Sequence, residues 1–88
     1  MGKKLYVANI ERWINDWQLQ DLFAQSGEID NQDSRIITDR ETWRSRWFGF
    51  ISFVNADDAD KAIEQFNWYE LNGRALFVTE ARPKKENN

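Results

Sequence analysis

The segment RWFGFISF, residues 46–53, constrains this chain most, because the β-strand that it predicts would carry large apolar side chains on both faces. Successive side chains of a strand point to opposite faces. Arg46, Phe48 and Phe50 therefore share one face. Trp47 and Ile51 lie on the other face, which we expect to point into the core. A strand with one wet side normally alternates apolar with polar residues, so its aromatic outer face indicates a binding surface.

Flat aromatic rings on an open sheet are platforms on which unpaired nucleobases stack. The segment 46–53 closely resembles the octamer of the RNA recognition motif, whose pattern is basic, Gly, aromatic, Gly or Ala, aromatic, Val, any residue, aromatic. Seven of the eight positions fit if Ile51 is accepted for Val, and Trp47 stands in place of the first Gly. The segment LYVANI, residues 5–10, is similar to the second signature of that family and places Tyr6 on the outer face.

The rest of the chain is similar to the same family over about residues 3–82. Helices are expected after Asn15, which can form a capping box with Gln18, and after Asn55. The order strand, helix, strand, strand, helix, strand predicts an α+β, ferredoxin-like fold with a four-stranded antiparallel sheet and two helices on one face. We expect one domain over residues 1–82 and a disordered basic and polar tail over 83–88. Strands are expected at residues 5–10, 35–38, 46–53 and 75–80.

The resemblance implies a binding site for single-stranded RNA on the outer face of the sheet. Tyr6 and Phe50 would each stack on a base, and Phe48 would insert between sugars or stack on a third base. A basic side chain at the start of the octamer would contact phosphate, and the C-terminal tail would close over the strand. Without the resemblance, the three rings are also compatible with partly exposed packing residues. The implied RNA-binding residues are Tyr6, Asn9, Arg46, Phe48, Phe50 and Arg82.

The composition excludes several other functions. The 88 residues include no Cys and no His, which excludes disulfides, Cys/His metal sites and catalysis by a thiol or an imidazole. The first turn of a helix would point Asp57, Asp58 and Asp60 in different directions. We therefore expect no enzymatic activity, no cofactor and no metal. No apolar run approaches the roughly 20 residues of a membrane span, so we expect a cytoplasmic protein that does not bind membranes.

The net charge of −3 argues against strong electrostatic attraction to a polyanion. Positive charge is concentrated in two places, residues 35–46 and residues 82–86, whereas the acidic side chains concentrate on the predicted helices. A solvated surface of mixed charge explains this distribution as well as a basic path for RNA does.

Trp43, Trp47 and Trp68 stand where the family pattern has Gly, in a chain with five Trp among 88 residues. Gly at such positions usually marks a positive φ or a close backbone approach, so each replacement risks about 1 kcal/mol of strain. Burial of a Trp can outweigh that strain only if another group covers the ring. We interpret the sequence as an engineered variant of a natural RNA recognition motif; an enlarged core and an unusual natural sequence are the alternatives.

The predicted topology brings Trp13, Trp17, Trp47 and Trp68 to one end of the domain, with Trp43 on a neighbouring hairpin. Trp17 lies opposite the apolar stripe of the first helix, so we expect it to be exposed. Exposed apolar clusters of this kind mark interfaces or ligand grooves. The alternative function is therefore a protein–protein interface, of which a homodimer is the simplest form, or a small-molecule pocket.

Overall fold

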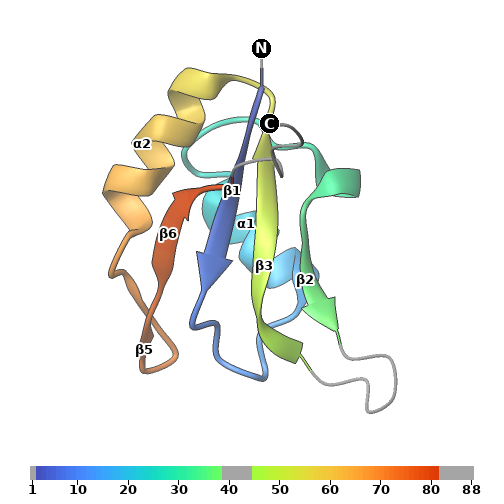
Figure 1. Ribbon diagram of the computed structural model, residues 1–88, viewed down its shortest axis with the longest axis vertical. Helices are drawn as coiled ribbons and strands as arrows, with labels where there is room; N and C mark the ends of the chain where they lie inside the picture. Colours follow the sequence, from blue (N-terminus) through green and yellow to red (C-terminus); the bar gives the residue numbers. More distant parts are fainter. Residues whose placement is uncertain (1, 39–44, 82–88) are drawn as a thin grey trace, which may run out of the picture.

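The structure is a computed structural model that describes residues 2–38 and 45–81 (Figure 1). The main sheet has the strand order β2-β3-β1-β6 with antiparallel neighbours, and β4 and β5 form a separate hairpin. This arrangement confirms the predicted α+β, ferredoxin-like fold, in which the expected last strand is divided into β5 and β6. The elements in chain order are β1 (Lys3–Ala8), α1 (Asp16–Phe23), the 3₁₀ helix η1 (Asn31–Asp33), β2 (Arg35–Thr38), β3 (Ser45–Phe53), α2 (Ala56–Phe66), β4 (Glu70–Leu71), β5 (Arg74–Ala75) and β6 (Phe77–Glu80).

Both described α-helices pack on the same face of the sheet. Leu5 and Val7 of β1 are fully buried, and so is Ile51 of β3, as the alternation of these strands predicts. The rings of Phe23 and Phe66, one from each helix, have centroids 4.7 Å apart. Figure 1 looks onto the sheet, with α1 behind β1 and β3. The strand residues form one apolar cluster with Leu19, Phe23, Ala59, Ala62 and Phe66 of the helices.

The first helix begins where its capping residue predicts. The N–H of Gln18 donates to Oδ1 of Asn15, and the N–H of Asn15 donates to Oε1 of Gln18, each over 3.0 Å. This reciprocal pair is the expected capping box. The capping box fixes the residue at which α1 begins, and Trp17 therefore lies in the first turn of the helix.

The strand β3 carries an irregularity just before its aromatic face. Its register with β2 shifts between Ile36 and Thr38, so residues 46–48 lie opposite a single residue of β2. Within this bulge Trp47 has a φ of 70° and a side chain that is 50% exposed. The prediction that Trp47 points into the core is therefore wrong, because a bulge interrupts the strict two-residue alternation on which that prediction depended.

Gly49 follows the bulge at the centre of the sheet. A Cβ at this position would lie 2.6 Å from the carbonyl oxygen of Arg35 and 2.9 Å from Cα of Ile36. Only glycine therefore lets β2 approach β3 this closely. The close approach places β2 beside the aromatic side chains of β3, with Arg35 as the register partner of Phe50.

Candidate nucleic-acid interface

Three aromatic rings meet on the face of the sheet opposite the helices, and we call them the aromatic platform. Tyr6 of β1 is the direct register partner of Phe50 of β3. The ring centroids are 5.6 Å apart for Tyr6 and Phe48, 5.8 Å for Tyr6 and Phe50, and 6.1 Å for Phe48 and Phe50. All three side chains are only partly buried. The structure thus brings together the rings of the two sequence motifs on a surface that can receive flat ligands.

Strand register extends the outer face to both edges of the sheet. Tyr6 pairs with Thr79 on one side and with Phe50 on the other, so one row of outward positions crosses the sheet. In the next row, Ala8 lies between Phe48 of β3 and Phe77 of β6. Phe77 is 39% exposed, which makes it a fourth aromatic side chain on this face. Neither of the two sequence motifs includes Phe77.

Lys4 supplies a positive charge beside the aromatic platform. Its Nζ lies 5.5 Å from the centroid of the Phe50 ring, within the range of a cation–π interaction. The same Nζ lies 3.2 Å from Oδ2 of Asp33 in η1, which partly neutralises it. The sequence motifs did not identify Lys4 as a site residue. Its position two residues before Tyr6 in β1 was the available signal, because such residues share a strand face.

Lys3, the preceding residue, points to the other side and has a different environment. Its Nζ lies 2.7 Å from Oδ1 of Asp60 and 3.7 Å from Oε1 of Glu80. The hydrogen bond to Asp60 raises the pKa of the Lys3 ammonium above its usual value, although partial desolvation opposes this effect. Lys3 therefore joins β1 to α2, and of these two neighbouring lysines only Lys4 faces the aromatic platform.

Asn9 holds the exit of β1 against β5. Its backbone has a φ of 64°, a conformation that Asn tolerates better than most residues. The Asn9 amide donates to the carbonyl of Ala75 over 2.9 Å and accepts from Nη2 of Arg74 over 2.6 Å. The Arg74 guanidinium in turn lies 5.7 Å from the Trp47 ring centroid. Both ends of the Asn9 amide thus make bonds within the fold, and its predicted role in RNA binding stays a prediction.

Trp68 lies next to Phe77 at the β6 edge of the sheet. The two ring centroids are 5.9 Å apart at an interplanar angle of 61°. Trp68 has a φ of 69°, and its side chain is 66% exposed. Trp47 and Trp68 therefore each contact a residue of the segment 74–77, while the expected gathering of all four tryptophans stays a prediction. Both also have the positive φ that a family Gly would adopt, yet neither ring is buried.

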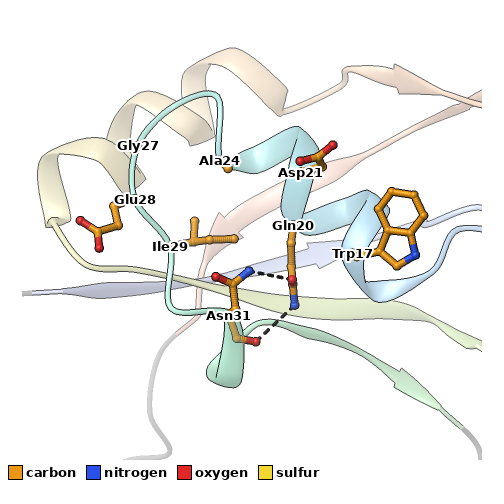
Figure 2. A pocket seen from close by; sticks show the side chains of 8 residues that line it. All are labelled: Trp17, Gln20, Asp21, Ala24, Gly27, Glu28, Ile29 and Asn31. Carbon is orange, nitrogen blue, oxygen red and sulfur yellow. Dashed lines mark hydrogen bonds between the residues drawn. The ribbon is translucent and has the colours of Figure 1, made fainter.

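Trp17 lies in a different environment, beside a groove of about 480 Å³ on α1 and the following loop. Figure 2 shows its ring projecting from the helix, on the same element as Asp21. Gln20 and Asn31 form part of the lining of this open groove, where Nδ2 of Asn31 donates to Oε1 of Gln20 over 2.8 Å. Trp17 is 64% exposed, as predicted. Trp13 is 76% exposed and has the Arg12 guanidinium 5.2 Å from its ring centroid.

Several predicted site residues fall where the structure is not described. The side chain of Arg46, the whole of Trp43 and Arg82, and the tail 83–88 lie outside the described residues. Within residues 2–38 and 45–81, no group of acidic side chains could hold a metal ion. In the same part of the chain, no helix is long and apolar enough to cross a membrane.

Comparisons with known proteins connect this geometry to one family. The model of the RNA recognition motif matches residues 5–76. The 28 kDa chloroplastic ribonucleoprotein of Nicotiana sylvestris is 42% identical over 81 residues, which cover 92% of this chain but only 29% of that protein. The crystal structure of RNA Binding Protein PG1 is 39% identical with a TM-score of 0.86, covering 96% of this chain and 99% of the other. A Sxl-lethal protein/RNA complex is 29% identical with a TM-score of 0.88, covering 98% of this chain and 50% of the other.

Proposed function

This chain belongs to the RNA recognition motif family, and we propose that it binds single-stranded RNA on the open face of its sheet. The observation that carries the proposal is the aromatic platform, where three partly exposed rings from two adjacent strands lie within 6.1 Å of one another. The Nicotiana relative is named a ribonucleoprotein, and the Sxl-lethal structure is a protein/RNA complex. Both names support the same ligand class.

The residues of the interface have distinct roles in this proposal. Tyr6 and Phe50 each stack on a base, while Phe48 contacts a sugar or a third base. Stacking contributes about 1–3 kcal/mol per base, so two or three bases give a gross energy compatible with micromolar affinity. Lys4 contacts the phosphate backbone beside Phe50. From the family pattern, Arg46 also contacts phosphate, and Arg82 closes over the strand together with the C-terminal tail.

Simultaneous truncation of two rings tests the proposal. The variant Phe48→Ala/Phe50→Ala removes most of the platform without touching the buried face of β3, so binding of single-stranded RNA should be lost. Trp17→Ala is the control, because it removes a larger and more exposed ring from the helical side. Fluorescence anisotropy with a labelled RNA pool of randomised sequence measures both variants. Unchanged affinity of the Phe variant, with circular dichroism verifying its fold, would falsify the proposal.

A second candidate function is self-association or small-molecule binding through the tryptophans. The supporting observation is that Trp13, Trp17, Trp47 and Trp68 are all between 50% and 76% exposed, so none is buried by the chain itself. The small-molecule version uses the groove beside Trp17. Sedimentation equilibrium from about 1 to 200 μM tests the homodimer, because micromolar association is populated in that range. A monomer at every concentration excludes it, whereas a dimer that Trp17→Ala abolishes supports it.

Binding rather than catalysis is proposed, because the chain has no His or Cys to act as a general base or a nucleophile. The cellular compartment is open to two proposals. Composition favours the cytoplasm, whereas the chloroplastic description of the Nicotiana relative favours the chloroplast. Fractionation of cells that produce the protein separates the two.

A further inference from the structure

We infer that the β6 edge of the sheet holds one more nucleotide of the bound RNA, with its base against Trp68 and Phe77. This inference rests on the proposed function, since it extends the same RNA strand beyond the aromatic platform. It assigns a ligand to a pair of rings that the two family signatures do not include.

The register of the sheet places this second pair of rings on the correct side. Phe77 and Phe48 are both opposite Ala8, from the two strands that flank β1. They are therefore two strand spacings apart, or about 10 Å. Ala8 lies between them, and its small side chain does not project between the two rings. A single RNA strand that crosses the sheet from β3 to β6 thus meets Phe77 and Trp68 after it leaves the platform.

The Trp68 ring is available to a ligand and its backbone is firmly held. The indole is 66% exposed, and its tilted contact with Phe77 uses only part of its surface. The N–H of Trp68 donates to the carbonyl of Leu76 over 2.6 Å, and the N–H of Leu76 donates to the carbonyl of Tyr69 over 2.8 Å. These two bonds keep Trp68 at its unusual φ. The ring is thus presented at the sheet edge by the fold, as a stacking surface requires.

A cation lies on β5, the strand that precedes β6, with its guanidinium 5.7 Å from the centroid of the Trp47 ring. Arg74 precedes Leu76 by two residues, and both Nε and Nη2 of Arg74 donate to Oδ1 of Asn9, over 3.2 and 2.6 Å. This acceptor is neutral, so the bonds orient the guanidinium without cancelling its charge. An oriented guanidinium is well suited to a phosphate oxygen. Arg74 is therefore assigned to the phosphate of the additional nucleotide.

RNA length is the variable that tests the inference. We would measure anisotropy with randomised RNA pools of two to eight nucleotides, for the unaltered chain and for Trp68→Gly. The unaltered chain should gain at least about fivefold in affinity at the length where the strand reaches the edge, because one further base stacks. Trp68→Gly should lose this step and keep the affinity for the shortest pools. Glycine suits the positive φ at this position, so the variant should fold.

Two controls make the outcome specific. Trp17→Ala removes a ring of nearly equal exposure and should follow the unaltered chain at every length. Trp68→Tyr retains an aromatic face and should recover most of the step.

The outcomes separate the inference from the proposed function. If Trp68→Gly retains the full length dependence while Phe48→Ala/Phe50→Ala loses all binding, the additional site is excluded and the proposed function stands. If the Phe variant binds every pool normally, the proposed function fails and the inference fails with it.

Discussion

Trp68 and Trp17 have the same side chain and almost the same exposure, 66% and 64%, but they lie in different surroundings. Trp68 contacts Phe77 on the face of the sheet that carries the aromatic platform. Trp17 lies on α1 beside an open groove whose polar lining includes the hydrogen-bonded pair Gln20 and Asn31 (Figure 2). Exposure alone therefore does not identify a binding residue in this protein. Continuity with other rings in the same strand register distinguishes the sheet side from the helical side.

The largest expected difference between the two sides concerns the central ring of the platform. Tyr6 contacts both Phe48 and Phe50, so Tyr6→Ala removes one stacking face and loosens two others. RNA affinity should fall between about 10-fold and 100-fold, whereas Tyr6→Phe should change it little because the ring remains. Anisotropy titrations measure both. An equal loss in the two variants would assign the effect to the hydroxyl group and not to stacking.

The next largest expected difference concerns protein stability and compares Gly49 on the sheet side with Gly27 on the helical side. A Cβ at Gly49 would meet the backbone of β2, whereas the three atoms nearest to a Cβ at Gly27 belong to the side chain of Asp58, of which Cγ and Oδ2 can rotate away. A backbone cannot move aside as a side chain can, so Gly49→Ala should lower the free energy of unfolding by about 2 kcal/mol and Gly27→Ala by clearly less. Urea denaturation measures both values. The reverse order would show that β2 can separate from β3 at little cost.

Trp68 and Trp17 should respond oppositely to replacement by glycine. Trp68→Gly relieves a positive φ, so the free energy of unfolding should rise by about 1 kcal/mol. Trp17→Gly places glycine in a helix, so the same quantity should fall by about 1 kcal/mol. Chemical denaturation measures the free energy of unfolding of each variant. A rise in stability together with weaker RNA binding in Trp68→Gly would separate binding from folding, whereas a fall would mean that the Phe77 contact outweighs the strain.

The smallest expected effect concerns the acids paired with the two lysines of β1. Asp33→Asn frees Lys4 beside the platform, and RNA affinity should rise about twofold, in keeping with an exposed ion pair. Asp60→Asn changes the net charge equally but acts on Lys3, which points away from the platform and keeps Glu80 as a partner, so RNA affinity should change less. Anisotropy at low salt is the sensitive measurement. Equal increases would indicate that only net charge matters.

The hypothesis of an engineered origin for the tryptophans stays a hypothesis. At the two described positions, Trp47 and Trp68, the backbone has the φ of 70° and 69° that glycine adopts easily. The rings are half exposed or more, so burial within the chain does not offset the strain. An enlarged core, one of the alternatives, therefore does not describe these two residues.

Local patterns in the sequence determined the order of the elements and the platform itself. Tyr6, Phe48 and Phe50 could be placed on the outer face because alternation along a strand depends only on neighbouring residues. The capping box of Asn15 and Gln18 could be predicted for the same reason, since its atoms are three residues apart. These parts of the fold and of the candidate site follow from residues that are close together in the chain.

Contacts between distant segments decided the positions of Trp47, Trp68 and Lys4 around the aromatic platform. The direction of Trp47 depends on how β3 pairs with β2, and the bulge that turns it outward is a property of both strands. The place of Trp68 depends on a backbone bond to Leu76, and the state of Lys4 depends on Asp33. No local periodicity contains this information, because each of these contacts forms only when separate segments pack together. The motifs therefore predicted the aromatic platform, and only the tertiary structure showed which further side chains surround it.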